Sequence, residues 1–418
     1  MAIGAVMEPL VVASLLAGGT LVNRNGQHAS TPRRRGSYHQ LEWEASPSDF
    51  DLEARRLRQE EKEDSTRTSR SSSDSTIVFD DDDDVAPSRW HQREIGFFGW
   101  KRQVTTPNNE IHRDRFLSRV LRQFPFLAEC WYWALIYWVY QLGRAFTAVT
   151  LQESTVDTAR EHALQVIHLE QYLGVFYELD VQALFIQDHD LMRWINRIYS
   201  FIHIPGSILF LIILFYVTTT QPQRLQANHG DLASQKHWKA PVSQFGPDLF
   251  EKRRRTMAMC NLLAFIVFTF WPCMPPRLLS DPTYMGEHAE EAKSFGFVDT
   301  VHGKDGDSSV WTTNKFCNQF AAMPSLHFGY SFLIGLTVAT IPLRKRGRIG
   351  WKRFAAIFVG MLYPALILTA IISTANHFIL DAVAGAIVCA IAWRFNRALL
   401  NLLPLEDYFL NLVRIHKP

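Results

Sequence analysis

Two stretches near the C-terminus determine how this chain is interpreted: AMPSLHFG at residues 322–329 and NHFILDAVAG at residues 376–385. Each stretch places a histidine, His327 or His377, at the edge of a long apolar run. Because an ionisable side chain is costly at membrane depth, each histidine is a candidate functional residue. Asp381 follows His377 by four residues, and a helix would place both side chains on one face. The spacing therefore predicts a His–Asp pair.

A third apolar run, which ends in Pro275-Pro276-Arg277, adds a cation. Taken singly, each residue has an ordinary explanation. A His–Asp pair can satisfy itself within a helix bundle, a lone His327 can serve packing, and Arg277 can anchor the chain at the interface. Two histidines, a carboxylate and an arginine on one side of a membrane together favour a phosphoryl-transfer site.

The composition divides the 418-residue chain into two parts. Residues 24–95 are polar and Ser-rich, include the acidic run Asp80 to Asp84, and are typical of disorder. Much of the remainder is apolar and aromatic, and the formal net charge of +2 gives no indication of a nucleic-acid partner. The five cysteines are scattered without CxxC spacing, which argues against a zinc site. Cys273 and Cys317 flank one loop, and we expect a disulfide between them.

Six apolar segments are each near the ~20 residues that a helix needs to cross a bilayer. They lie at about 126–150, 197–219, 256–274, 324–343, 353–375 and 377–400. We therefore predict an all-α fold, a polytopic membrane helix bundle with a six-helix core over residues 126–400. Residues 1–22 contain a shorter apolar run and are a candidate additional N-terminal membrane helix.

The segments around these spans have other expected structures. Residues 24–95 are expected to form a disordered cytosolic tail, and residues 401–418 a cytosolic C-terminal tail. The basic stretch 101–125 is expected to form a surface helix that leads into the membrane. Apolar residues recur at helical spacing over 156–192, which predicts a helix that lies on or dips into the membrane.

Basic residues predict the topology, because short cytosolic loops are enriched in Lys and Arg. Such residues cluster in three segments, at 252–255, 344–353 and 394–414. With these segments in the cytosol, the junctions that hold Arg277, His327 and His377 face the lumen or the exterior. The charge pattern, which carries no information about catalysis, thus places all three residues on one side.

These residue types suggest a two-step phosphoryl transfer that needs no metal or other cofactor. His377 is the expected nucleophile, and Asp381 would accept a hydrogen bond from its ring and stabilise the imidazolium that forms. His327, near a predicted helix start, would protonate the leaving oxygen and then deprotonate the acceptor. Arg277 would bind phosphate oxygens, with Ser325 as a further phosphate ligand.

Both histidine stretches resemble motifs of the phosphatidic acid phosphatase type 2/haloperoxidase superfamily, and more closely those of its inositol phosphorylceramide synthase-like branch. The resemblance covers about residues 126–400. Further similar segments lie at residues 169–174, 199–205, 275–278 and 296–300. The resemblance implies a six-helix core, a phosphohistidine intermediate on His377 and an acid–base role for His327.

The sequence departs from the phosphatases of this superfamily where they bind phosphate. Phe270 stands in place of the lysine of their KxxxxxxRP pattern, and Ile371 in place of the arginine of SRxxxxxHxxxD. Two cations are therefore absent, which disfavours phosphatidic acid phosphatase activity. Candidate replacements in the following loop are His302, Lys304 and Lys315.

We therefore predict an integral membrane phosphotransferase that moves a phosphoalcohol headgroup, such as phosphoinositol, from a phospholipid donor to a lipid hydroxyl. His203, Glu170 and Asn376 are expected at the headgroup site, although helix packing explains His203 and Glu170 equally well. The alternatives are hydrolysis of a lipid or isoprenoid phosphate and, from another class, a non-catalytic lipid-binding membrane protein. We expect an endomembrane location, in the Golgi or endoplasmic reticulum, with the site on the lumenal or exterior face. The sequence does not indicate the acceptor or any protein partner.

Overall fold

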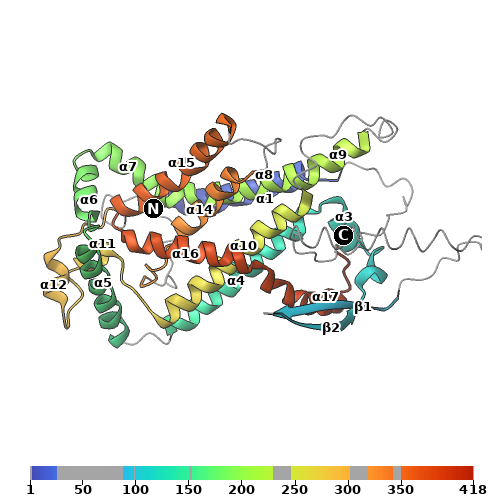
Figure 1. The fold of residues 1–418 in the computed structure, drawn as a ribbon, viewed down its shortest axis with the longest axis horizontal. Helices are drawn as coiled ribbons and strands as arrows, with labels where there is room; N and C mark the ends of the chain where they lie inside the picture. The colour runs from blue at the N-terminus through green and yellow to red at the C-terminus, as the bar shows by residue number, and fades with distance from the viewer. Residues whose placement is uncertain are drawn as a thin grey trace, which may run out of the picture. The chain divides into compact units, whose positions relative to one another are not determined.

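The computed structural model describes residues 2–25, 88–97, 99–149, 153–228, 246–301, 319–341 and 350–417. Over these residues the fold is mostly helical, with a two-stranded antiparallel sheet (Figure 1). The N-terminal elements are α1 (Ala2–Val22), β1 (Trp90–Phe97), β2 (Trp100–Pro107), the 3-10 turn η1 (Asn109–His112), α3 (Phe116–Gln123) and α4 (Phe126–Val149). The next elements are α5 (Glu153–Leu173), α6 (Glu178–Ile186), α7 (His189–Arg197), the π-helical turn η2 (Ile198–Ile202), α8 (His203–Phe215), the π-helical turn η3 (Tyr216–Thr220) and α9 (Gln221–Asn228). The C-terminal elements are α10 (Gly246–Phe270), α11 (Pro276–Leu279), α12 (Ala289–Ser294), α14 (Leu326–Ala339), α15 (Trp351–Ser373), α16 (Ile379–Phe395), the 3-10 turn η5 (Asn396–Leu402) and α17 (Leu403–Val413).

Helices occupy all six segments that are predicted to cross a membrane. They are, in order, α4, α8, α10, α14, α15 and α16. Within the described ranges, three helical stretches are long and apolar enough to span a bilayer: His189–Arg224, Trp351–Ser373 and Ile379–Val413. The fold therefore supports a helical membrane protein, and a core of six spans stays a prediction.

Residues 156–192 form three shorter helices, where the sequence pattern predicts one. α5 ends at Gly174, whose φ of 69° lies in the left-handed region that glycine adopts without strain. Asp188 caps α7, because its side chain accepts hydrogen bonds from the backbone N–H groups of Asp190 and Leu191. These two breaks turn α5, α6 and α7 in different directions at one end of the bundle (Figure 1).

Glycines allow α14 to pack closely between α15 and α16. A Cβ added to Gly335 would lie 2.5 Å from the Gly360 carbonyl oxygen of α15. A Cβ added to Gly385 of α16 would lie 2.3 Å from the carbonyl oxygen of Ser325, the N-cap of α14. Small residues at such crossings are typical of membrane helix bundles. The close contact sets the start of α14 directly against α16.

Gly385→Ala is expected to destabilise the bundle by about 1–3 kcal/mol, because the new methyl group meets backbone that cannot rotate away. It is also expected to lower activity by displacing the start of α14. Thermal unfolding of the purified protein measures the first effect. Gly18→Ala is the matched control, because a Cβ at Gly18 meets nothing within 4 Å. Equal unfolding temperatures for the Gly385 variant and wild type would contradict the close packing.

The hairpin of β1 and β2 corrects the all-α prediction. Trp90 pairs with Pro107 and Phe97 with Trp100, and Gly99 in the connecting turn has φ 88°. The predicted disorder over 24–95 is therefore wrong for the strand residues, while residues 26–87 lie outside the described part of the chain. The predicted surface helix over 101–125 is also wrong, because β2 and η1 occupy its first half and only α3 is α-helical.

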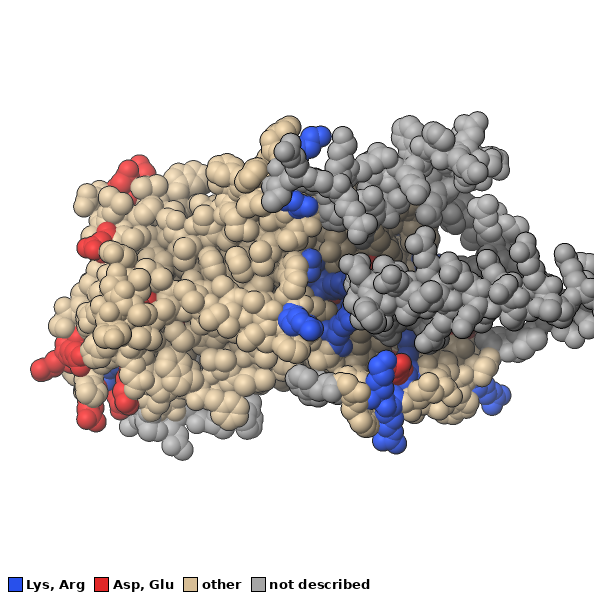
Figure 2. All heavy atoms as spheres, in the orientation of Figure 1, with Lys and Arg blue, Asp and Glu red and all other residues tan. Residues whose placement is uncertain are grey.

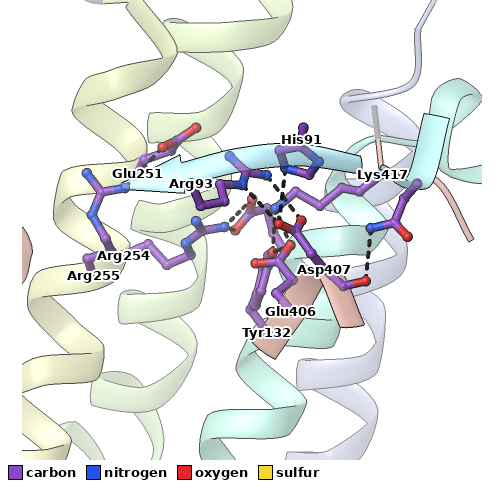
Figure 3. Close-up of polar contacts among 11 residues, drawn as sticks. His91, Arg93, Tyr132, Glu251, Arg254, Arg255, Glu406, Asp407 and Lys417 are labelled. Atoms are coloured by element: carbon purple, nitrogen blue, oxygen red, sulfur yellow. Dashed lines mark hydrogen bonds and ion pairs between the residues drawn. The ribbon is translucent and has the colours of Figure 1, made fainter. Parts of the chain in front are cut away.

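A buried carboxylate on α17 holds the hairpin in place (Figure 3). Nε and Nη2 of Arg93 donate to Asp407 at 2.9 and 3.1 Å, and Thr106 Oγ1 donates to it at 2.8 Å. Beside them, Lys417 pairs with Glu406 at 2.8 Å. The prediction of a C-terminal tail over 401–418 is therefore corrected: α17 is a structured helix joined to the hairpin by a bidentate ion pair.

The predicted Cys273–Cys317 disulfide is not present in the described residues. Cys273 is a buried free thiol. Cys317 lies outside the described ranges. The backbone of Cys273 instead pairs with the segment before α14, since Cys273 N–H donates to the Phe320 carbonyl at 2.8 Å. This pairing brings the end of α10 to the start of α14.

Candidate active site

The two motif histidines meet where α14 and α16 begin. His327 is the second residue of α14, and its ring centroid lies 5.6 Å from that of His377. The sequence spacing predicts His377 and Asp381 on one helix, but Phe378 is the N-cap of α16. His377 therefore lies in the turn before the helix, where Ala375 has a left-handed φ of 51°. The turn aims the imidazole at α14 instead of along the face of α16.

The tautomer of His377 follows from its hydrogen bond. Nδ1 lies 2.8 Å from the carbonyl oxygen of Ala322. A carbonyl oxygen can only accept, so Nδ1 must carry the proton in the neutral ring. Nε2 is then unprotonated, and among the described residues it has no hydrogen-bond partner. This nitrogen is the one available as a nucleophile.

Asp381 supports the same ring from a greater distance. Its Oδ2 lies 3.4 Å from Nδ1 of His377 and accepts the backbone N–H of Phe378 at 2.9 Å. The expected direct His–Asp hydrogen bond is thus replaced by one to Ala322, with the carboxylate as a nearby negative charge. A fixed charge at this distance stabilises an imidazolium.

Aromatic rings surround His327. The ring of Tyr199, from η2, stacks on it at 4.8 Å, and the ring of His203 lies 4.9 Å away. Nδ1 of His203 is 3.2 Å from the hydroxyl of Tyr363. π-Helical turns such as η2 occur frequently at functional sites. His203, an expected headgroup residue, therefore lies beside the predicted acid–base histidine.

Arg277 is held at the site by two side chains. Its Nε donates to Asn376 Oδ1 at 2.9 Å, and Nη1 donates to Asp299 Oδ2 at 3.0 Å. Asn376 in turn donates through Nδ2 to Thr374 Oγ1 at 2.8 Å. These contacts fix the guanidinium next to the His377 turn, and among the described residues its other N–H groups are left for an anion. Asn376 thus positions Arg277 and is itself buried.

Two buried glutamates cap the helix that follows His377. Glu170 Oε1 accepts the N–H of Leu380 at 2.7 Å, and Glu178 Oε1 accepts the N–H of Ile379 at 2.8 Å. Both side chains are fully buried, and the second oxygen of each has no other donor. Burial and the adjacent Glu178 carboxyl raise the pKa of Glu170 to about 9. Glu170 therefore keeps a proton at neutral pH, and both glutamates anchor the start of α16. Glu170 thus caps α16, and its place at the headgroup site stays a prediction.

The proton on Glu170 predicts how the free energy of unfolding depends on pH. Glu170 keeps its proton in the folded state up to about pH 9, whereas an unfolded glutamate loses it near 4.5. Between these values the folded state binds more protons than the unfolded state. The contribution of Glu170 to the free energy of unfolding is therefore fully present at low pH and is lost as the pH rises through this range. Between pH 6 and 8, the unfolding temperature of wild type is expected to fall by several degrees more than that of Glu170→Gln. Parallel pH profiles of the unfolding temperature for the two proteins would contradict a protonated Glu170.

Ser325 has a structural role that the sequence does not indicate. Its hydroxyl accepts the N–H of Phe328 at 3.3 Å and caps α14, and its N–H donates to the Asp381 carbonyl at 2.9 Å. The side chain is fully buried. Phosphate binding by Ser325 stays a prediction. The candidate replacement cations His302, Lys304 and Lys315 lie outside the described residues.

Several residues that contribute to the candidate site were not predicted from the sequence. Glu178 lies between apolar residues of an amphipathic stretch, and its carboxylate there was the available signal. Tyr199 and Asp299 lie in segments that resemble the superfamily but received no role. The Ala322 carbonyl has no side-chain signal at all.

One side of this site is built from α11, the start of α14 and the turn before α16, which all belong to the C-terminal part of the chain. Residues 244–395 match the PAP2 superfamily. The PAP2 segment includes Arg277, His327, His377 and Asp381, but not the glutamates of α5 and α6. The match supports this superfamily and indicates phosphatase or phosphotransferase activity on lipid-like substrates. No curated protein and no solved structure gives a significant match.

Proposed function

We propose that this chain is an integral membrane phosphotransferase that moves a phosphoalcohol headgroup, such as phosphoinositol, to a lipid hydroxyl through a phosphohistidine intermediate on His377. The observation that carries the proposal is the 2.8 Å hydrogen bond from Nδ1 of His377 to Ala322, which leaves Nε2 unprotonated. A neutral imidazole with one free nitrogen is a nucleophile near neutral pH. The PAP2 match supports the same class of reaction.

In the first half-reaction, Nε2 of His377 attacks the phosphorus of the donor phospholipid. An N–P bond forms while the P–O bond to diacylglycerol breaks. His327, which takes up a proton beside the bound phosphate anion, donates that proton to the departing oxygen. The His377 ring becomes cationic, and the Ala322 carbonyl at 2.8 Å and the Asp381 carboxylate at 3.4 Å stabilise that charge. Arg277 binds the non-bridging phosphate oxygens through its remaining N–H groups.

In the second half-reaction, the acceptor hydroxyl gives its proton to His327 and attacks phosphorus. The N–P bond breaks, and His377 returns to its neutral form. His327 is again an imidazolium, so protons balance over the cycle. The ring separation of 5.6 Å lets both imidazoles reach one phosphoryl group.

The charge at the site favours a phosphodiester over a phosphomonoester. Phe270 and Ile371 replace the lysine and arginine of the phosphatase patterns, and Phe270 is 82% exposed while Ile371 is fully buried among apolar residues. A phosphomonoester carries about −1.5 to −2 charges at pH 7, whereas a phosphodiester carries one. Arg277, already paired with Asp299, is better matched to the single charge. This supports headgroup transfer over hydrolysis of phosphatidic acid.

The distribution of charge supports a site on the non-cytosolic face. Figure 2 shows Lys and Arg in a band where α10 and α15 begin and α16 ends, and Asp and Glu gathered near α5 to α7 and α12. By the positive-inside rule the basic band is cytosolic. His377 precedes α16, so it lies at the other end of that helix, about 25 Å away at 1.5 Å per residue.

The test uses purified full-length protein in lipid vesicles, with the products resolved by mass. Labelled phosphatidylinositol with ceramide is supplied in one reaction, and labelled phosphatidic acid in another. We expect a transfer product from phosphatidylinositol that depends on His377. Release of free phosphate from phosphatidic acid, without any transfer product, would overturn the proposal in favour of the phosphatase.

A further inference from the structure

Within the part of the chain that the structure describes, Arg253 is a buried guanidinium without a carboxylate partner. Its neighbours on α10 are paired: Arg254 with Glu129 at 2.6 Å and Arg255 with Glu251 at 3.0 Å (Figure 3). Arg253 is only 8% exposed, its Nε is buried without a hydrogen-bond partner, and no ion pair forms to it within the described chain. Burying a charge without a partner is costly. An anion from outside the chain would remove that cost.

The ring of Trp393 fixes the orientation of the planar Arg253 guanidinium. Its guanidinium carbon lies 3.4 Å from the centroid of the Trp393 ring, a cation–π contact from α10 to α16. Stacking on one face fixes the plane of the guanidinium, and within the described residues its N–H edge forms no ion pair. Burial lowers the pKa of Arg253 to about 10, so the group remains charged at neutral pH.

An unpartnered acceptor lies on the next turn. Asn396, the first residue of η5, donates through Nδ2 to the Trp393 carbonyl at 2.7 Å, and its buried Oδ1 has no partner among the described residues. α10 packs against both α16 and η5, so this acceptor and Arg253 belong to one junction. A guanidinium edge with a nearby amide oxygen can receive a phosphate together with a hydroxyl or ammonium group.

We propose that Arg253, stacked on Trp393, binds the phosphate of an anionic phospholipid headgroup in the leaflet at the basic end of the bundle. The planar N–H edge matches two phosphate oxygens, as a lysine would not. The surrounding basic band attracts anionic lipids to that surface. The site lies at the opposite end of α16 from His377, so it is separate from the reaction.

The test measures thermal unfolding of the full-length protein in phosphatidylcholine nanodiscs with increasing phosphatidylserine, which is not a donor in the proposed reaction. Phosphatidylserine is expected to raise the unfolding temperature of wild type. Arg253→Gln is expected to need at least about ten times more of it for the same rise. The control Lys352→Gln removes an exposed charge of the same band, and no more than about a fivefold change is expected. In phosphatidylcholine alone, Arg253→Gln is expected to be at least as stable as wild type, because a buried unpaired charge is gone.

Three outcomes would overturn the proposal. The first is an equal response of Arg253→Gln and wild type to phosphatidylserine. The second is a full stabilisation of wild type by inorganic phosphate in phosphatidylcholine, which would make the ligand a free anion. The third outcome uses Arg253→Lys, which keeps the charge without the planar edge, in case Arg253→Gln does not fold. A full response of Arg253→Lys to phosphatidylserine would exclude recognition of the headgroup by the planar guanidinium.

Discussion

His377→Ala is expected to lower the rate of headgroup transfer by roughly a factor of 10⁴ or more, because the substitution removes the imidazole on which the covalent intermediate forms. Nε2 is the only unprotonated ring nitrogen that the His377 turn offers, since Nδ1 donates to Ala322 at 2.8 Å. Binding of the donor should change little, because Arg277 and Asn376 keep their mutual hydrogen bond at 2.9 Å. The vesicle assay with labelled phosphatidylinositol and ceramide measures the rate.

The matched control is His162→Ala. His162 also donates from Nδ1 to a backbone carbonyl, that of Pro272 at 2.7 Å, and stacks on Trp271. The His162→Ala variant therefore loses the same type of hydrogen bond at a residue outside the proposed site. Its rate of headgroup transfer is expected to stay within about threefold of wild type. A His377→Ala protein that folds and keeps more than a tenth of wild-type activity would show that His377 is not the nucleophile.

The second large effect is expected for His327→Ala, a loss of roughly 10²–10⁴ in the same assay. The role proposed for His327 is proton transfer to the leaving diacylglycerol oxygen. With a 4-nitrophenyl ester of phosphoinositol the leaving group needs no proton. The first burst of nitrophenol should then be preserved in the variant, while steady-state turnover stays slow because the acceptor is not deprotonated.

Tyr199→Phe serves as the control for His327, because it keeps the ring that stacks at 4.8 Å. Its burst and turnover are expected to stay within a few-fold of wild type. Loss of the nitrophenol burst in His327→Ala, in a protein that still unfolds cooperatively, would mean that His327 positions the substrate and does not transfer a proton.

Much of the helical framework could be predicted from the sequence, because apolar runs near the ~20 residues of a bilayer span leave few alternatives. The hairpin of β1 and β2 could not be predicted from the sequence. Residues of β1 alternate in burial, but the inward-facing side chains include His91 and Arg93. Their burial depends on Asp407, more than 300 residues away in the chain. A strand whose inner face is polar has no apolar alternation to detect.

The candidate active site could likewise be predicted from the sequence only in part. His327, His377 and Arg277 are individually conspicuous in apolar surroundings, so residue type and charge topology were sufficient to group them. The partner of His377 was assigned to Asp381 from spacing alone. The closer partner is a backbone carbonyl 55 residues earlier, at Ala322, and a carbonyl has no residue-type signal. Glu170 was expected to contact a headgroup, and only the tertiary contact to Leu380 reveals its capping role.

The most direct test of the account is to trap the headgroup on His377. Wild-type protein is mixed with inositol-labelled phosphatidylinositol without acceptor, quenched under alkaline denaturing conditions and digested for mass spectrometry. We expect one phosphoinositol group on Nε2 of His377, released by acid and absent from His377→Ala. Steady-state transfer by wild type without covalent label, or equal labelling of the His377→Ala protein, would contradict the phosphohistidine mechanism.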